Sequence, residues 1–453
     1  MNIIIMGNGK IGRTLISSLV KEGHNIIAID DDSAVITELT NIYDIMGVCG
    51  NGVDCDVLEE ADVENAELFV ATTGSDELNM LACFLAKKMG ATQTIARIRN
   101  PEYNDRSLRF MRQHLDLSLS INPDLLAAQE LFNILKLPSA VKIEKFSRRN
   151  FEILELKLKE DSEIGGMNLI ELRSKYNAKF LICTVQRGEE VFIPDGNFVL
   201  KGGDKIGITA DKSEIHKLLK SMKILRRQAK SVMILGGSKT AFYLAKMLIN
   251  AGSSVKIIER DRDRCHKLCD TLPKAVIIHG DGAQQELLLE AGLESTDAFV
   301  ALTGMDEENI LISIFAQTQG VPKVISKSNR PELYSMAKKL GLDCVVSPRE
   351  TTSDLVVSYA RALKNSLGDN NIETLYNLMD GKAEALEFNV TAQSNVTDIP
   401  LRDLKTRPNT LIAGIIRGRK AIIPSGEDLI MVGDKVIVIT SGHGLSDLTD
   451  ILL

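Results

Sequence analysis

The chain has 453 residues, of which 44% are hydrophobic, and this length accommodates two to four domains with well-packed cores. Its formal net charge of −7 excludes a general nucleic-acid-binding surface, so we expect no nucleic-acid partner. No apolar run approaches ~20 residues, and the short run Ile3–Met6 leads directly into glycines, as a first strand does. We therefore expect a soluble, intracellular protein without a signal peptide.

Short apolar runs alternate with helical patterns up to about residue 135. We expect strands at Ile3–Met6, Asn25–Ile29, Ile45–Val48, Leu68–Thr72, Thr94–Ile98 and Leu117–Ile121, and helices at Ile11–Glu22, Ser33–Thr40 and Glu77–Met89. Continuous apolar strands that are separated by helices predict a doubly wound parallel sheet with both faces covered.

The pattern changes after Pro138, where apolar and charged residues alternate as they do in half-exposed antiparallel strands. We expect strands at Phe151–Leu158, Lys179–Gln186, Val191–Ile193 and Lys205–Thr209, and short helices at Met167–Lys175 and Lys212–Leu219. The PDG and GGDK segments are typical of turns. This part predicts a small α+β domain, followed by a linker at Ser221–Lys230.

The chain then repeats itself in a nearly constant register. Gly236 follows Gly7 by 229 residues, and ALTGMDEENIL from Ala301 follows ATTGSDELNML from Ala71 by 230. A tandem duplication of half the chain therefore predicts an α/β protein with two Rossmann-like, doubly wound parallel-sheet domains, each followed by a small α+β domain. We place the four modules at 1–137, 138–222, 228–367 and 370–453, with the second sheet reaching about Ser347.

The first copy opens with a complete glycine motif between a strand and a helix. It comprises Gly7, Asn8, Gly9, Lys10, Ile11 and Gly12, and Asp30 ends the next strand. Gly7 allows a tight turn, Gly9 lets the backbone approach a pyrophosphate, and Gly12 permits close helix packing. The helix N-terminus offers free N–H groups to phosphate, and Asp30 would accept hydrogen bonds from ribose hydroxyls, which disfavours a 2′-phosphate.

The second copy departs from this motif where phosphate should come closest. It reads Gly236, Gly237, Ser238, Lys239, Thr240 and Ala241, and Glu259 keeps the strand-end carboxylate. Ala241 is an accepted third residue, but Ser238 adds a side chain at the second position. The second site therefore binds a nucleotide more weakly, binds differently or stays empty, and the sequence leaves these alternatives open.

Further candidate ligand contacts follow strands in both copies, at the sheet edge where such folds bind their ligands. They are Asn51, Thr73, Gly74 and Arg97 in the first copy, and Asp281, Thr303, Gly304 and Lys327 in the second, with Arg99 as a nearby alternative cation. We expect Asn51 and Asp281 to border the adenine, and Arg97 and Lys327 to reach phosphate.

No catalytic machinery accompanies these motifs. A dehydrogenase needs a proton donor or acceptor beside the nicotinamide, and the histidine nearest a predicted ligand loop, His279, is replaced by Cys49 in the first copy. We interpret His279 as structural and predict no catalytic residue.

Metal and basic surface sites are not predicted either. Cys265, His266 and Cys269 lie within about one helical turn, but no second ligand pair stands at a zinc-like spacing. The seven cysteines form no paired framework, which favours free thiols in a reducing cytoplasm. The basic run Lys223–Arg227 is interpreted as a solvated linker.

The module order, with MGNGKIG, Asp30, ATTGSDELNM, ARIRNPEY and the IPDG and GGDK turns, resembles the regulator-of-potassium-conductance (RCK) family. The resemblance implies a cytoplasmic subunit, peripheral on the inner face of the cell membrane, that assembles as a dimeric or tetrameric ring beneath a potassium-translocating membrane protein. It also implies binding of NAD(H), with ATP or ADP as competing ligands. Carried over by position, the contacts would be Gly7–Ile11, Asp30, Thr73, Gly74 and Arg97, and in the second copy Gly236–Thr240, Glu259, Thr303, Gly304 and Lys327.

These observations favour a ligand-operated regulator of a potassium uptake transporter. Two alternatives remain open at this point. One is a nucleotide-dependent oxidoreductase, and the other is a regulator of a different cation channel or antiporter that carries the same modules.

Overall fold

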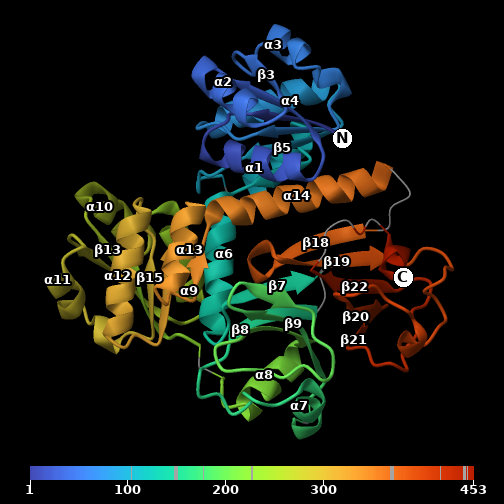
Figure 1. Ribbon diagram of the computed structural model, residues 1–453. Coiled ribbons are helices and arrows are strands. Elements are labelled where there is room, and N and C mark those ends of the chain that lie inside the picture. Colours follow the sequence, from blue (N-terminus) through green and yellow to red (C-terminus); the bar gives the residue numbers. More distant parts are fainter. Residues whose placement is uncertain are drawn as a thin grey trace. The chain divides into compact units, whose positions relative to one another are not determined.

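A computed structural model describes residues 1–103, 105–146, 151–176, 178–225, 228–367, 372–418, 420–441, 445 and 447–453 (Figure 1). By their contacts, residues 1–129, 238–244 and 346–360 form one unit, and residues 130–237, 245–345 and 361–453 form another. Arg226 and Arg227 of the basic run, and residue 370, where we expect the last module to begin, lie outside the described residues. The four module boundaries stay a prediction.

The first unit contains a six-stranded parallel sheet, drawn in blue to teal in Figure 1, in the order β3-β2-β1-β4-β5-β6. Its strands are β1 (Asn2–Met6), β2 (Asn25–Asp30), β3 (Met46–Cys49), β4 (Leu68–Ala71), β5 (Gln93–Arg97) and β6 (Leu119–Ile121). The helices between them are α1 (Lys10–Lys21), α2 (Ser33–Ile42), α3 (Cys55–Glu60), α4 (Asp76–Lys88) and α5 (Asp105–His114), and α6 (Pro123–Lys136) follows. The strand order reverses between β1 and β4, which places a ligand crevice at their carboxyl ends.

The same architecture recurs in the second copy. The parallel sheet β14-β13-β12-β15-β16-β17 repeats the strand order. Its strands are β12 (Ser231–Leu235), β13 (Ser254–Glu259), β14 (Val276–His279), β15 (Ala298–Ala301), β16 (Lys323–Lys327) and β17 (Val345–Val346). Its helices are α9 (Lys239–Asn250), α10 (Arg262–Thr271), α11 (Gln285–Glu290), α12 (Asp306–Thr318), α13 (Pro331–Lys339) and α14 (Pro348–Leu367). Two Rossmann-like sheets are therefore confirmed.

Each parallel sheet is followed by an antiparallel one. The first, in the order β10-β9-β11-β8-β7, contains β7 (Lys142–Phe146), β8 (Phe151–Lys157), β9 (Phe180–Arg187), β10 (Glu190–Phe192) and β11 (Lys205–Asp211), with α7 (Leu169–Lys175) and α8 (Lys212–Ser221). The second, in the order β18-β19-β22-β20-β21, contains β18 (Ile372–Leu378), β19 (Ala383–Asn389), β20 (Thr410–Arg417), β21 (Lys420–Ile422) and β22 (Lys435–Thr440).

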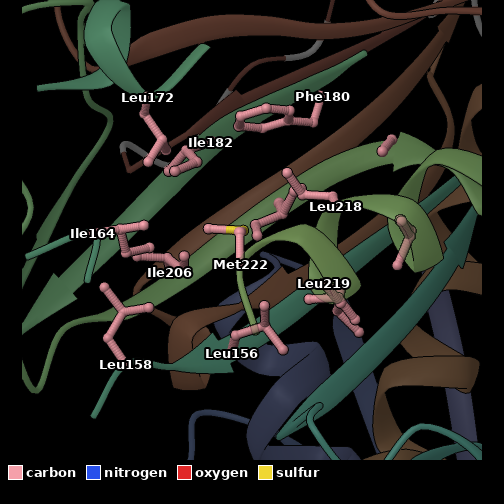
Figure 2. Packing of buried hydrophobic residues seen from close by; sticks show 14 of the residues in the cluster. Leu156, Leu158, Ile164, Leu172, Phe180, Ile182, Ile206, Leu218, Leu219 and Met222 are labelled. Carbon is pink, nitrogen blue, oxygen red and sulfur yellow. The ribbon is translucent and has the colours of Figure 1, made fainter. Parts of the chain in front are cut away.

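One core joins α7 and α8 to the first antiparallel sheet. Figure 2 shows Leu156 and Ile206 from the sheet packed with Leu218 and Met222 from α8 and its end. Apolar residues at alternate strand positions point to this face, because side chains alternate between the two faces of a strand. The predicted α+β character of the small domain is therefore confirmed.

The expected elements agree with the structure apart from their ends, but the sequence pattern missed β7, α3, α5 and α6. Helix α5 (DRSLRFMRQH) is short and mostly polar, so few apolar residues mark it in the sequence. Strand β7 is an edge strand, and edge positions carry weaker hydrophobic alternation than central ones.

The two antiparallel sheets repeat an ion pair between neighbouring strands. Glu155 and Lys205 lie 2.5 Å apart in the first, and Glu387 and Lys435 lie 3.4 Å apart in the second. The first pair also contacts the turn after β18: the backbone N–H of Met379 donates to Glu155 (2.8 Å), and Lys205 lies 3.5 Å from Asp380.

Candidate functional site

The three motif glycines of the first copy meet different constraints. Gly7 has a φ of +84°, and a Cβ there would lie 2.6 Å from the backbone nitrogen of Thr73. A Cβ at Gly12 would lie 2.4 Å from the carbonyl oxygen of Gly7. A Cβ at Gly9 would meet no atom within 4 Å. The fold therefore requires Gly7 and Gly12, whereas the open space beside Gly9 fits the close approach of a ligand.

The first turn of α1 supplies free donors beside this space. Gly9 is the N-cap of α1, and no side chain accepts a hydrogen bond from the helix end. Lys10 is exposed and Ile11 is half-buried in the first turn that follows. Unpaired backbone N–H groups and the positive end of the helix dipole form an anion-binding site.

Asp30 lies beside this loop, at the end of β2. Its Oδ2 accepts a hydrogen bond from the backbone N–H of Asn8 (2.5 Å), and its Oδ1 accepts one from Asp32 (3.1 Å). The Asn8 side chain is buried and donates to the carbonyl of Ile29 (2.9 Å). A carboxylate has about four acceptor positions, so the half-buried Asp30 keeps capacity for ribose hydroxyls.

A buried asparagine fixes the loop after β4. Asn79 Oδ1 accepts hydrogen bonds from the N–H (2.8 Å) and hydroxyl (2.7 Å) of Thr73, and Asn79 Nδ2 donates to the carbonyl of Arg97 (2.9 Å). Gly74 follows, and a Cβ there would meet no atom within 4 Å. The loops after β4 and β5 are therefore held together at the carboxyl edge of the sheet.

Two arginines bring positive charge to the same edge. Arg97 is 9% exposed, and its Nε has no hydrogen-bond partner in the part of the chain that the structure describes. Burial lowers the pKa of Arg97 and neighbouring Arg99 lowers it further, whereas Asp76 and Asp124 oppose this shift. An incompletely bonded, buried guanidinium fits a bound phosphate, which would supply acceptors.

Arg99 is already engaged within the protein. Its Nε donates to Asp124 Oδ2 (2.8 Å), and its backbone N–H donates to Asp76 Oδ2 (2.8 Å). Of the two candidate cations, Arg97 is therefore the one that has a guanidinium N–H without a partner among the described residues and available to a ligand.

Asn51 lies in the loop after β3, as expected. It is exposed, and its Oδ1 accepts a hydrogen bond from the backbone N–H of Val53 (3.3 Å). Asp281 occupies the matching position and accepts from the N–H of Ala283 (3.0 Å). Both side chains stabilise their own turns, so contact with adenine stays a prediction.

In the second copy, the strand-end carboxylate is more deeply buried. Glu259 is 5% exposed, and its Oε2 accepts a hydrogen bond from the backbone N–H of Gly237 (2.6 Å). Gly236 has a φ of +91°, and a Cβ there would lie 3.0 Å from the nitrogen of Thr303. The tight turn and the carboxylate contact are therefore repeated.

The rest of this loop is occupied by its own contacts. Ser238 Oγ accepts a hydrogen bond from the N–H of Ala241 (3.3 Å), so it caps α9. The hydroxyl of Thr240 donates to Asp124 Oδ1 (2.9 Å), and Lys239 is exposed. The first turn of α9 therefore has fewer free backbone N–H groups than the first turn of α1.

The loop after β15 matches its counterpart closely. Asn309 Oδ1 accepts hydrogen bonds from the N–H (2.9 Å) and hydroxyl (2.8 Å) of Thr303, and Asn309 Nδ2 donates to the carbonyl of Lys327 (3.1 Å). Gly304 again has open space beside it. The Thr-Gly loop is therefore preserved even where the glycine motif is not.

No group of three or more His, Cys, Asp or Glu side chains among the described residues is placed to hold a metal ion. Cys265 is buried and donates to the carbonyl of Glu259 (3.4 Å), whereas Cys269 is exposed. His279 Nε2 lies 3.1 Å from the carbonyl oxygen of Arg260.

Sequence reasoning overlooked the residues that hold the site together. Asn79, Asn309, Asp76 and Asp306 bond to the loops after the fourth and fifth strands of their sheets. They form two identical pairs, Asp76 with Asp306 and Asn79 with Asn309, in the repeated segments ATTGSDELNML and ALTGMDEENIL. Identity at polar positions of a duplicated motif was the signal that could have found them.

The described residues form no helix that is both long enough and apolar enough to span a membrane.

Family comparisons match both halves of the chain. The TrkA-N domain model matches residues 3–113 and 232–348, and the TrkA-C domain model matches residues 153–223 and 385–453. The chain is 31% identical over 455 residues to the Trk system potassium uptake protein TrkA homolog of Archaeoglobus fulgidus, covering 100% of both chains. It is 30% identical over 448 residues to the Trk system potassium uptake protein TrkA of Haemophilus influenzae, covering 97% of this chain and 96% of that one.

Solved structures show the same fold. The GsuK channel bound to NAD matches with a TM-score of 0.63 at 17% identity, over 97% of this chain and 76% of that chain. GsuK bound to ADP matches with a TM-score of 0.52 at 15% identity, over 81% and 69%.

Proposed function

Because this chain belongs to the family of Trk system potassium uptake proteins TrkA, we propose that it is the cytoplasmic regulatory subunit of a potassium transporter. It would act on the inner face of the membrane and respond to NAD(H), with ATP or ADP competing for the same site. The observation that carries the proposal is the first copy's phosphate cradle, where Gly9 leaves open space beside the free end of α1.

The residues of the first copy fit a dinucleotide in separate roles. The first turn of α1 and Arg97 would hold the phosphates, and Asp30 would accept hydrogen bonds from the ribose hydroxyls. The negatively charged phosphates of the dinucleotide would thus bind both the first turn of α1 and Arg97. The GsuK channel bound to NAD and GsuK bound to ADP share this fold, which supports the ligand class.

Regulation requires that the ligand bind two arrangements of the chain with different affinity, because a ligand shifts an equilibrium only by that difference. Asn79 is hydrogen-bonded to both Thr73 and the carbonyl of Arg97. A ligand that displaces Arg97 would therefore also displace Thr73. A regulator of this kind needs no catalytic residue, and we propose that the chain is not an enzyme.

Self-assembly is supported by exposed apolar side chains at matching positions of the two copies. Leu81 and Leu311 are 48% and 65% exposed, and Phe110 and Leu340 are 64% and 49% exposed. Single exposed apolar side chains are ordinary, but their recurrence at equivalent positions of the two copies favours a shared interaction surface. We propose that they contact a second copy of this chain in a dimeric or tetrameric ring.

The binding site is tested by titrating the purified chain with NADH, NAD, ATP and ADP. We expect Asp30→Ala to weaken NADH binding at least 10-fold, because charge-assisted hydrogen bonds to the ribose are lost. Asp44→Ala, which removes an exposed carboxylate elsewhere in the same unit, is the control. Equal NADH affinity in wild type and Asp30→Ala would exclude the assigned site.

The regulatory role is tested by co-purification with a potassium-translocating membrane protein from the same cell, with and without NADH.

The assembly is tested by sedimentation of the double variant Leu81→Asp/Leu311→Asp, which we expect to sediment as smaller species than the wild type. Hydride transfer from NADH to small carbonyl compounds at ordinary enzyme rates would contradict the non-enzymatic role.

A further inference from the structure

The second copy differs in charge along the segment that follows the second strand of its sheet. Residues 30–38 hold four acidic and no basic side chains, whereas residues 259–267 hold three acidic and four basic ones. The formal charge therefore changes from −4 to +1. In this fold the segment lies beside the adenosine ribose, so its charge selects which ribose substituents are accepted.

Arg264 is the basic residue that the structure places at the strand-end carboxylate. Its Nη1 lies 3.6 Å from Oε2 of Glu259, and its side chain remains 52% exposed. Glu259 is buried, and its oxygens accept hydrogen bonds from the backbone N–H groups of Gly237 (2.6 Å) and Asp261 (2.8 Å). A ligand at this edge would therefore meet an exposed guanidinium before a carboxylate.

The first copy presents the opposite surface. The N-cap residues Asp32 and Asp261 are equivalent, so Val35 stands where the second copy has Arg264. Asp30 is only half-buried, and residues 31–38 add three more carboxylates and no basic side chain. Arg13 of α1 is the cation on this side, but its Nη2 donates to Glu38 Oε2 (2.8 Å), so it is engaged within the protein. A ribose phosphate would be repelled there, whereas free ribose hydroxyls would find an acceptor.

The phosphate end of the second copy changes in the opposite sense. Ser238 accepts the N–H of Ala241, so α9 offers fewer free donors to a pyrophosphate than α1 does. A ligand of the second copy therefore gains less binding free energy from the helix end and more from a cation beside its ribose.

We propose that the second copy binds a dinucleotide that carries a phosphate on its adenosine ribose, NADP(H), and that Arg264 selects it. This inference rests on the proposed function for the class of ligand, and it assigns the two copies different members of that class. A guanidinium binds a phosphate through paired, charge-assisted hydrogen bonds, and an arginine near this strand end is how the fold accommodates a 2′-phosphate.

The test uses the full chain with Gly9→Ser, whose side chain fills the phosphate space of the first copy and so weakens NADH and NADPH there alike. The chain has no tryptophan, so the emission of bound NADPH or NADH is measured without a background from that residue. We expect NADPH to bind this chain at least 10-fold more tightly than NADH. Adding Arg264→Val, the first copy's own residue, should abolish that preference, whereas adding Lys274→Ala, an exposed lysine beyond α10, should leave it unchanged.

The outcomes separate the two proposals. NADH binding in the wild-type chain that Asp30→Ala weakens, combined with equal NADPH and NADH affinities in the Gly9→Ser chain, overturns this inference alone. Unchanged NADPH affinity after Arg264→Val also overturns it, even if the preference exists. No dinucleotide binding by the wild-type chain contradicts the proposed function as well.

Discussion

The two nucleotide loops of this chain share a backbone plan but differ in where their hydrogen-bond donors go. In the first copy, Gly9 caps α1 without a side-chain contact, and the helix end stays free. In the second, Ser238 accepts a hydrogen bond from Ala241 and satisfies part of the helix end internally. The comparison teaches that a duplicated fold can keep its turn and its strand-end carboxylate while the hydrogen bonding of its helix end changes.

The largest effect is expected where the fold itself requires a glycine. Gly12→Ala should destabilise the chain by about 3 kcal/mol, because the new Cβ would overlap the carbonyl oxygen of Gly7. Urea unfolding measures the loss. Gly74→Ala, which enters open space, should unfold like the wild type, and a stable Gly12→Ala chain would show that the loop yields easily.

Replacing Gly9 tests the ligand constraint by copying the second loop into the first. Gly9→Ser should lower NADH affinity about 100-fold, equivalent to about 2.7 kcal/mol, because the side chain fills the phosphate space. The unfolding midpoint should not fall, since no protein atom lies within 4 Å of the new Cβ. If NADH binds Gly9→Ser as tightly as the wild type, phosphate does not lie beside Gly9.

The ion pair of the first antiparallel sheet extends to Asp380, in the turn after β18. Burial raises the pKa of Asp380, but the charges of Lys205 and Lys338 outweigh it. Hydrogen bonds from Lys338 and from the Tyr334 hydroxyl lower the pKa further, to about 2.

A depressed carboxyl pKa stabilises the folded chain above the unfolded value, and this stability is lost as the pH falls. Asp380 should therefore contribute about 2 kcal/mol at neutral pH that disappears between about pH 4 and pH 2. Asp380→Asn should remove this part of the pH dependence, as measured by denaturant unfolding at several pH values. Asp161→Asn, at an exposed position, is the control, and an identical pH profile for both variants would contradict the assignment.

The smallest effect concerns the cap of α9. Ser238→Gly should cost only a few tenths of a kcal/mol, because glycine is itself a tolerated N-cap residue. Nucleotide affinity of the second copy should rise several-fold as the N–H of Ala241 becomes free. Titration in the Asp30→Ala background measures this change, and a fall in affinity would mean that the Ser238 hydroxyl itself contacts the ligand.

Much of the fold was predictable because the repeat fixed the order of the elements and the apolar runs fixed the strands. The motif glycines indicated a tight turn at Gly7 and close packing at Gly12, and the structure shows both. Binding at Gly9, Asp30 and the other candidate contacts stays a prediction, since it depends on a ligand.

Other parts of the site depend on contacts between residues far apart in the sequence. Thr240 bonds to Asp124 across 116 residues, and Asn79 bonds to the carbonyl of Arg97 across 18. Local periodicity carries no information about such pairs, because it reports only which face of an element is buried. The proximity of Arg264 to Glu259 was equally hidden, since it depends on how α10 packs beside β13.

The open space beside Gly9 has a consequence for genetics. A substitution there would yield a chain that folds, accumulates and resists proteolysis normally, because abundance in the cell follows folding stability. Screens for protein level or heat resistance would not distinguish this variant from the wild type. If the proposed function holds, defects at this position would surface as altered potassium uptake, and a selection based on growth would find variants that no stability assay distinguishes.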